Sequence, residues 1–351
     1  MNLNKTPLVS ITILCYNHEK YIAKAIESCL NQTYKNLEII IVDNASTDGS
    51  RVIIEAYQKK SDKIKFFKLD ENRLPSGGTN FAIKQTKGEY IAILSGDDSF
   101  QLDKIEVQLN YMLEHDLTNC FTWANIVNDK GKKLLEHEMA DLFNRNFTND
   151  SLKEHFASRG NALCALTAMF HKDIFTKYGF LDHRLLQLQD FEFWLRIIKH
   201  EPITVLPQEL TNYCIRDDEN NLSLGRGKEV VLRSAFEYTY VMRHILDFDL
   251  QVLSNVTRKI CTNENRYKNL FEYYKKEKKY SYANAVLFNL YEELGADFEF
   301  PSQKYKIFFD IYSKYDPFQT HYAQRLKNVA QFLGIKSSLK IFVKKISSLK
   351  K

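Results

Sequence analysis

The sequence predicts an α/β domain built on a helix-flanked parallel sheet, followed by an all-α region. Three observations lead to this prediction. Short apolar runs alternate with amphipathic segments through the first hundred residues. Acidic residues follow two of those runs directly, and strand patterns vanish beyond about residue 229.

Four apolar runs have the length and composition of buried strands, and amphipathic helical segments separate them. The predicted strands are 8–15, 38–44, 63–69 and 90–96. The predicted helices are 20–30, 50–60 and 80–88, the last preceded by a glycine-containing loop. This alternation predicts parallel strands joined by helices, a Rossmann-like layer.

The following part of the chain continues the α/β pattern before its character changes. A helix is predicted over 102–115, strands over 118–128 and 163–170, and an amphipathic helix over 187–199. A polar stretch then leads into segments at helical spacing. We therefore expect three parts, namely a domain at 1–225, a helical domain at 226–334 and a basic tail at 335–351.

Composition excludes several classes of protein. Of 351 residues, 44% are hydrophobic and 26% charged, as in globular proteins, and a net charge of +5 is too small to indicate nucleic-acid binding. The six cysteines form no CxxC pair, which favours a reducing compartment. No apolar run approaches 18 residues, and no signal-peptide pattern opens the chain. We expect a cytoplasmic protein.

Carboxylates stand at the ends of two predicted strands, where parallel sheets bind their ligands. Asp43 follows the second strand and can accept a hydrogen bond from a nucleobase N–H or a ribose hydroxyl. Asp97 and Asp98 follow the fourth. Adjacent carboxylates suit a divalent cation shared with substrate phosphates, which would stabilise a departing diphosphate.

Two further places carry side chains suited to substrate binding or catalysis. Cys15, Tyr16 and Asn17 end the first strand and offer an aromatic face with small polar groups for a base. Asp190 stands at the start of an aromatic helix, where a carboxylate can act as general base for a hydroxyl nucleophile.

Each candidate also has a purely structural interpretation. Asp43 can shape the turn that follows it. Asp97 and Asp98 can cap the next helix, and Asp190 can cap its own. Tyr16 can be a core residue. Read one at a time, the residues leave these alternatives open.

Taken together, three segments resemble family 2 glycosyltransferases. Residues 10–50 are similar to the family's V-S-x-I-I-P-T-Y-N, S-x-x-x-Q-T-Y and E-I-I-V-V-D-D-G-S-x-D series. Residues 77–98 match G-x-x-x-A-x-N, A-x-G-x-Y-I and the aspartate motif, and LQDFEFWLRI at 188–197 resembles E-D-x-(D/E)-x-W-L-R. The resemblance covers roughly residues 7–225.

The resemblance implies a GT-A fold, the Rossmann-like nucleotide-diphospho-sugar transferase domain. It implies a nucleotide-sugar donor, most simply a UDP-sugar, a Mn²⁺ or Mg²⁺ ion, and transfer with inversion at the anomeric carbon. The acceptor would be a hydroxyl of a glycan or lipid-linked saccharide in surface polysaccharide or glycoconjugate synthesis.

The family's functional residues transfer to matching positions of this sequence. Tyr16 and Asp43 would hold the nucleobase, and the nucleotide-sugar site would also include Cys15, Asn17 and Gly78.

The remaining positions concern the diphosphate and the acceptor. Asp97 would lie by the ribose or the metal, Asp98 would ligate the metal, and Asp190 would deprotonate the acceptor hydroxyl.

The chain departs from the family pattern at four places. Leu14-Cys15 replaces Pro-Thr, and Asn44-Ala45 replaces the second Asp and the Gly of D-D-G-S. Ser95 replaces the first Asp of a D-x-D motif. Gln189 replaces the acidic residue before the base, which removes a like charge and should lower the pKa of that base.

Arg216 lies where the family often carries a histidine near the diphosphate. A permanently charged guanidinium binds phosphate well, so we expect a diphosphate clamp. The alternative is an exposed loop arginine among acids.

The tail 335–351 has apolar residues at helical steps and lysines over much of the rest. From Phe318 to Lys351 there are eight Lys or Arg and no acidic residue. Such a helix suits an anionic membrane surface, here the inner face of the cell membrane. The alternative is a helix docked on its own domain or on a partner chain.

Two other functions compete with the transferase. A sugar-phosphate nucleotidyltransferase shares a Rossmann-like nucleotide site, but its glycine-rich basic signature is missing here. A non-catalytic nucleotide-sugar-binding or scaffold protein is the other alternative, suggested by Ser95 and Gln189. It would bind nucleotide without turnover.

Overall fold

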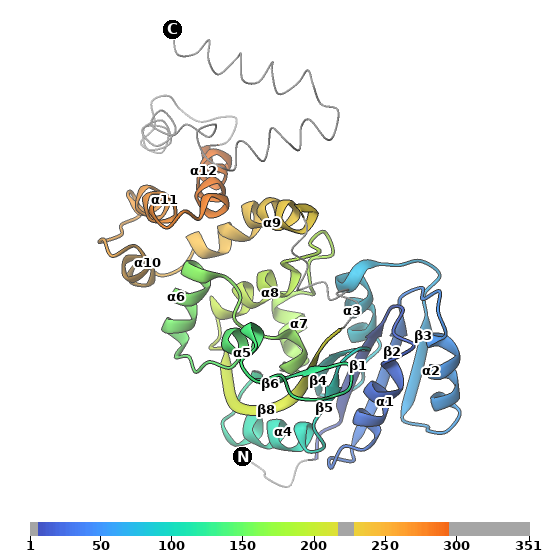
Figure 1. Ribbon diagram of the computed structural model, residues 1–351. Coiled ribbons are helices and arrows are strands. Elements are labelled where there is room, and N and C mark those ends of the chain that lie inside the picture. The colour runs from blue at the N-terminus through green and yellow to red at the C-terminus, as the bar shows by residue number, and fades with distance from the viewer. Residues whose placement is uncertain (1–5, 217–227, 295–351) are drawn as a thin grey trace, which may run out of the picture. The chain divides into compact units, whose positions relative to one another are not determined.

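The computed structural model describes residues 6–216 and 228–294 (Figure 1). The chain divides into two compact units. The first unit comprises Met1–Glu237 with Asp247–Val256, and the second comprises Tyr238–Leu246 with Thr257–Lys351. The boundary predicted near residue 225 and the predicted tail 335–351 lie outside the described residues.

The first unit is built on one eight-stranded sheet with the order β3-β2-β1-β4-β7-β6-β8-β5. Its strands are β1 (Val9–Cys15), β2 (Leu37–Asp43), β3 (Ile64–Lys68), β4 (Tyr90–Ser95), β5 (Ser99–Phe100), β6 (Asn119–Asn128), β7 (Met169–His171) and β8 (Thr204–Ile215).

The sheet is mixed: the parallel arrangement predicted from the first four strands is confirmed, and in the other half β6 and β8 also pair in parallel, next to antiparallel pairs. β1 pairs in parallel with β2 and β4, and β2 with β3, as helical crossovers require. β7 runs antiparallel to both β4 and β6, and β5 runs antiparallel to β8. The alternating period of the first hundred residues does not continue beyond them, which is why the second half differs.

Helices cover both faces of the parallel half (Figure 1). The helices of the first unit up to β8 are α1 (Ile22–Leu30), α2 (Ser50–Gln58), α3 (Leu74–Lys84), α4 (Lys104–Glu114), α5 (Glu138–Phe143), α6 (Asn149–Arg159), the 3₁₀ turn η1 (Ala165–Thr167), α7 (Asp173–Tyr178) and α8 (Gln189–Ile198). In β2, Ile39 and Ile41 belong to the core cluster that includes α1 and α4, whereas Ile40 and Val42 pack with residues of α3. Because successive side chains of a strand point to opposite faces of the sheet, β2 contributes apolar residues to the layer on each face.

Helix α3 begins six residues before the helix predicted at 80–88. The sequence LPSGGTN looks like a loop, but Pro75 occupies the first turn, where its missing N–H is tolerated. Gly78 is needed for close packing, because a Cβ there would lie 2.4 Å from Cδ1 of Leu14. The glycines therefore allow the helix to approach β1 and do not interrupt it.

Two strand predictions need correction. The strand predicted at 163–170 is confined to Met169–His171 and follows the turn η1. β8 was not predicted, since Pro207 and Glu209 interrupt its apolar pattern. Its pairing with β6 accommodates this interruption through register shifts on either side of Trp123.

In the described part of the chain after β8, residues 228–294, helices dominate, as the loss of strand patterns predicts. They are α9 (Lys228–Leu246), α10 (Leu250–Thr257), α11 (Arg266–Lys276) and α12 (Tyr280–Leu294). In the second unit, Tyr282 donates a hydrogen bond to the Tyr238 hydroxyl at 2.9 Å and packs against Tyr274. Within the described residues, no helix combines the length and apolarity needed to cross a membrane.

Lys104, the first residue of α4, is fully buried in the core beneath the sheet. Its Nζ has no hydrogen-bond partner and lies 4.3 Å from the centre of the Phe100 ring. Burial disfavours the charged form and lowers the pKa of Lys104 from 10.5 to about 7. The buried amine therefore destabilises the fold at neutral pH.

We predict that Lys104→Met raises the free energy of unfolding at pH 7 by about 2–4 kcal/mol, since the thioether fills similar volume without a charge. In the native protein, the unfolded chain binds the proton between pH 7 and 10.5 and the folded chain does not, so stability rises with pH over this window. Denaturant titrations at pH 7 and 10 should show that rise reduced in the variant.

The control is Lys59→Met, at an exposed lysine just beyond α2. It should leave both stability and its pH dependence unchanged. Equal stability of Lys104→Met and the native protein at pH 7 would show that the buried amine costs nothing.

Candidate functional site

Three strands deliver polar groups to the same edge of the sheet. The parallel register places Cys15 beside Asp43 and Leu14 beside Ser95. The chain turns out of the sheet directly after each of these strands. The predicted clustering at the carboxyl ends of the strands is therefore present in the structure.

Asp43 is fully buried, and its two oxygens differ in their surroundings. Oδ2 accepts hydrogen bonds from Nε of Arg51 at 2.5 Å and from the backbone N–H of Ser46 at 3.1 Å. Oδ1 is buried without any hydrogen-bond partner. Oδ2 therefore shapes the turn, while Oδ1 remains an acceptor suited to an N–H of a bound base.

The segment after β1 presents Tyr16 to solvent. Asn17 has a left-handed backbone (φ 55°), and its side chain accepts the N–H of Thr47 at 2.8 Å while its own N–H donates to the Ser46 hydroxyl. Tyr16 is 43% exposed. The interpretation of Tyr16 as a core residue is therefore wrong, and Asn17 fixes the loop on which Tyr16 stands.

Cys15 contributes its backbone carbonyl to the structure of the site, and Gly78 allows two elements to pack closely there. The Cys15 thiol is buried, which raises its pKa to about 12 and keeps it protonated. Its carbonyl accepts the N–H of Asn44 at 2.8 Å. Gly78 is buried against Leu14 and lets α3 lie close to the end of β1. The Cys15 carbonyl holds the loop after β2 at the same place.

Asp97 lies among groups that carry or can carry positive charge. Its Oδ1 accepts the hydroxyl proton of Ser95, and its Oδ2 lies 3.7 Å from both His18 Nε2 and Arg216 Nη1. The side chain of Asp97 is only 11% exposed to solvent. Here Ser95, which replaces an aspartate of the family motif, orients the remaining carboxylate.

Asp98 is more deeply enclosed than its neighbour. Its Oδ1 accepts the backbone N–H of Cys214 at 2.7 Å, and burial together with the charge of Asp97 raises the pKa of Asp98 well above its ordinary value. Helix α4 begins at Lys104 with Asp103 as its N-cap residue, so neither Asp97 nor Asp98 caps it.

The donor set at this place fits a hard divalent cation that shares its ligands with a phosphate. Asp97 and Asp98 supply carboxylate oxygens, which Mg²⁺ and Mn²⁺ prefer. Among the described residues, no group of three or more His, Cys, Asp or Glu is arranged to hold a metal. A cation here would therefore need substrate oxygens or water to complete its coordination.

Arg216 is not an exposed loop residue. Its side chain is 10% exposed, and the guanidinium lies 5.2 Å from the centre of the Tyr21 ring. Tyr21 in turn donates a hydrogen bond to Asp129 at 3.0 Å. These contacts hold a permanent positive charge beside Asp97, where a diphosphate could meet it.

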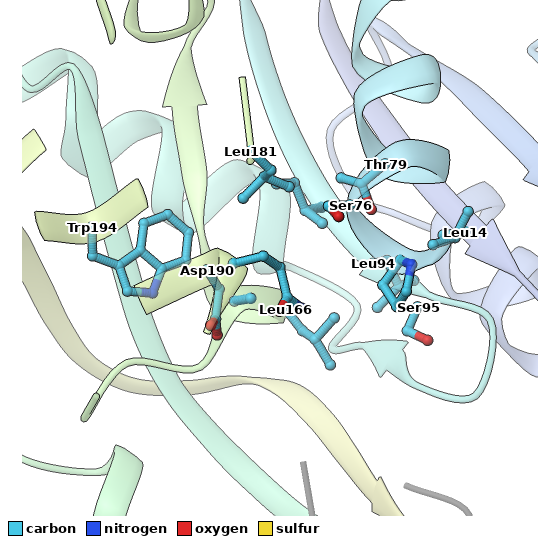
Figure 2. A pocket seen from close by; sticks show the side chains of 13 residues that line it. Leu14, Ser76, Thr79, Leu94, Ser95, Leu166, Leu181, Asp190 and Trp194 are labelled. Atoms are coloured by element: carbon cyan, nitrogen blue, oxygen red, sulfur yellow. The ribbon is translucent and has the colours of Figure 1, made fainter. Parts of the chain in front are cut away.

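A cavity of about 160 Å³ opens beside this edge (Figure 2). Its wall comprises Leu14, Pro75, Ser76, Thr79, Ile93, Leu94, Ser95, Ala165, Leu166, Leu181, Gln189, Asp190 and Trp194. Figure 2 shows Asp190 and Trp194 of α8 on one side, opposite Leu14 and Ser95 from the strand ends. The cavity thus joins the predicted base to the predicted nucleotide site.

Asp190 lies in the first turn of α8 and is half-buried. Its Oδ1 accepts the N–H of Phe191 at 2.6 Å, and its Oδ2 accepts a hydrogen bond from Asn161 at 3.2 Å. Burial, with a smaller contribution from the charge of Glu237, raises the pKa of Asp190 to about 6. Burial therefore determines the direction of the shift, and the lowering expected from Gln189, relative to an acidic residue at that position, stays a prediction.

Sequence reasoning missed two residues of the site. Arg51 neutralises Asp43, and Asn161 orients Asp190. Arg51 is the second residue of α2, directly after the turn that follows Asp43, where a basic residue near a buried aspartate is a usable signal. No local pattern marks Asn161, which reaches Asp190 through the fold.

Comparison with known proteins agrees with this geometry. Residues 10–179 match the sequence profile of glycosyl transferase family 2. An uncharacterized glycosyltransferase of Methanocaldococcus jannaschii is 32% identical over 221 residues, which cover 62% of this chain and 74% of that protein. The Bacillus subtilis protein TuaG, whose name assigns it to teichuronic acid biosynthesis, is 31% identical over 196 residues, covering 56% and 74%.

Solved structures share the fold. Staphylococcus aureus TarS 1–349, crystallised with UDP-GlcNAc, superposes with a TM-score of 0.56 at 20% identity, covering 86% of this chain and 80% of that one. The mannosyltransferase PcManGT of Pyrobaculum calidifontis, crystallised with GDP-Man and Mn²⁺, gives a TM-score of 0.51 at 14% identity, covering 94% and 87%. The sheet and its flanking helices form a GT-A fold. From the coverage and identity of its relatives, the chain belongs to glycosyl transferase family 2.

Proposed function

We propose that this protein is a metal-dependent, inverting glycosyltransferase. It transfers a sugar from a nucleotide-sugar, a UDP-sugar in the first instance, to a hydroxyl of a glycan or lipid-linked acceptor in surface polysaccharide synthesis. One observation carries the proposal. A carboxylate with a pKa of about 6, that of Asp190, lines the same cavity as Leu14 and Ser95 at the predicted nucleotide site.

The nucleotide would lie along the strand ends. The free Oδ1 of Asp43 would accept an N–H of the base, and the exposed ring of Tyr16 would stack on it. Arg216 would contact the diphosphate and share its charge during departure. UDP-GlcNAc in a TarS crystal structure supports the choice of a UDP-sugar as first candidate.

Asp190 would act on the acceptor. Ionised above pH 6, its carboxylate removes the hydroxyl proton as the acceptor oxygen bonds to the anomeric carbon. The bond from that carbon to the diphosphate oxygen breaks, and its electron pair leaves with the nucleoside diphosphate. Attack opposite the leaving group inverts the anomeric carbon and needs only one base.

Asp97 and Asp98 would hold the divalent cation, whose chemistry is to neutralise charge on the departing diphosphate. Asp98 offers Oδ2, since its Oδ1 already accepts the Cys214 amide. Asp97 offers Oδ2, which now faces His18 and Arg216. Mn²⁺ in the PcManGT structure supports a metal requirement in this fold.

The acceptor and the cell location stay predictions. The name of TuaG supports a surface polysaccharide as product. A lipid-linked acceptor would place the enzyme at the inner face of the cell membrane. Co-sedimentation with anionic liposomes, with and without residues 335–351, tests that placement, and equal binding of both forms would remove the predicted role of the tail.

Nucleotide release tests the transferase function directly. We expect one donor among UDP-, GDP- and dTDP-sugars to be hydrolysed slowly without acceptor, with Mn²⁺ or Mg²⁺ restoring activity lost in EDTA. Undiminished release in EDTA would contradict the metal proposal. Calorimetric binding of UDP with no turnover of any donor or acceptor would favour the binding protein instead.

Replacing Asp190 tests the base. Asp190→Asn should lower kcat by about 10²- to 10⁴-fold, because it removes proton transfer from the transition state. Activity of the native enzyme should rise with pH through about 6, as the carboxylate ionises, and this acid limb should disappear in the variant's residual activity. Affinity for free nucleoside diphosphate should stay within about twofold, since Asp190 touches the acceptor.

Asp173→Asn is the matched control, at an aspartate with 55% side-chain exposure in the first turn of α7. It should behave as the native enzyme at every pH. Native kcat in Asp190→Asn would remove this residue from the mechanism.

A further inference from the structure

The backbone that leads into α8 is anchored by a distant carboxylate. Glu237 of α9 is 3% exposed and accepts the N–H groups of Leu186 and Gln187 at 2.9 Å and of Leu188 at 2.8 Å. Leu188 is the N-cap residue of α8, and its own side chain makes no capping bond. Glu237 thus holds, from another helix, the segment that a local cap would otherwise fix.

A second residue of the same helix face reinforces the contact. Arg233, one turn before Glu237 on α9, donates a hydrogen bond to the side-chain oxygen of Gln187 at 2.9 Å. Both residues belong to the first unit, with the sheet and the cavity. Hydrogen bonds to an ionised group are stronger than neutral ones, so the Glu237 contacts form the stiffer part of this anchor.

We propose that Glu237 is a positioning residue for Asp190, holding the backbone of residues 186–188 so that the carboxylate stays at the cavity wall. The inference rests on the proposed role of Asp190 as base. A base must stay within hydrogen-bond reach of the hydroxyl that it deprotonates, and a displacement of about 1 Å can cost about 100-fold in rate. Asp190 is two residues from the last anchored N–H, so movement of that backbone moves the base.

Glu237 also affects the charge of the base. Among the described residues, the Glu237 carboxylate and the Cys164 thiol are titratable groups that interact with Asp190. Burial raises the pKa of Cys164 far above neutrality, so the thiol stays uncharged, and Asn161 contributes a neutral amide. The negative charge of Glu237 is therefore the contribution that a single substitution can remove.

Two substitutions separate position from charge. Glu237→Gln removes the charge and one acceptor oxygen, whereas Glu237→Asp keeps the charge but withdraws the acceptors by one methylene. We expect both to lower kcat by about 10- to 100-fold, with affinity for free nucleoside diphosphate unchanged. Only Glu237→Gln should change the pKa of Asp190. It should lower that pKa, because a like charge is lost.

The titration is read without turnover, from the ¹³C carboxyl resonance that is absent in Asp190→Asn. Turnover is measured with the donor whose nucleotide is released in the panel above. Glu38→Gln is the matched control, at a 7% exposed carboxylate on β2 that accepts the N–H of Lys87 and the hydroxyl of Ser10. It should lower the melting temperature without changing kcat or the Asp190 titration.

The outcomes distinguish the positioning role of Glu237 from the role of Asp190 as base. Native kcat in both Glu237 variants, or equal loss of kcat in Glu38→Gln, would overturn the positioning role. If Glu237→Gln does not fold, Glu237→Asp alone decides, since native kcat in it contradicts the proposal. Native kcat in Asp190→Asn would instead overturn the base, while a shifted resonance in Glu237→Gln would still establish the electrostatic contact.

Discussion

The parallel pairing of β1 with β2 and β4 is the constraint on which the site depends. This register sets Cys15 beside Asp43 and Leu14 beside Ser95, so chain segments far apart in sequence end at one edge. A shift of one residue would exchange the two faces of a strand and separate its polar end from those of its neighbours. Both faces of β2 are apolar, one in the core cluster with α1 and the other packed with α3, so its position is marked by Asp43 at the end of the apolar run.

The cost of burying acidic groups is met differently at each position. Asp43 has Arg51, Asp97 has Arg216 and His18 nearby, and Asp98 has the backbone amide of Cys214 and a weaker interaction with Arg216. Asp190 receives no cation, and a raised pKa is the result. Carboxylates without a cationic partner are expensive to ionise unless a substrate, a metal or a proton compensates them. Asp190, which has no such partner among the described residues, is the carboxylate to which we assign proton transfer.

Sequence patterns predicted the elements whose periodicity is local. β1, β2 and β4, and the acidic residues at the ends of β2 and β4, were identified because apolar runs and strand ends are visible within ten residues. α3 was misread since Gly78 serves packing against Leu14, a contact between separate elements. β8 was missed because its pairing with β6 tolerates Pro207 through register shifts.

The chemical state of the site was less predictable than its location. The pKa of Asp190 depends on its burial and on Asn161 and Glu237, which reach it only through the fold. The two sequence interpretations of Arg216, a diphosphate clamp or an exposed loop arginine, are separated only by its burial and its contacts with Tyr21 and Asp97. Position at a strand end is a sequence property, whereas burial and remote partners are not.

The central claim is that donor and base meet in the cavity between the strand ends and α8. A crystal structure with the turned-over donor and Mn²⁺, using Asp190→Asn to preserve it, tests this most directly. The account predicts the sugar in the cavity between Ser95 and residue 190, with the diphosphate beside Asp97 and Arg216. A sugar bound away from residue 190, or a diphosphate distant from both Asp97 and Arg216, would contradict it.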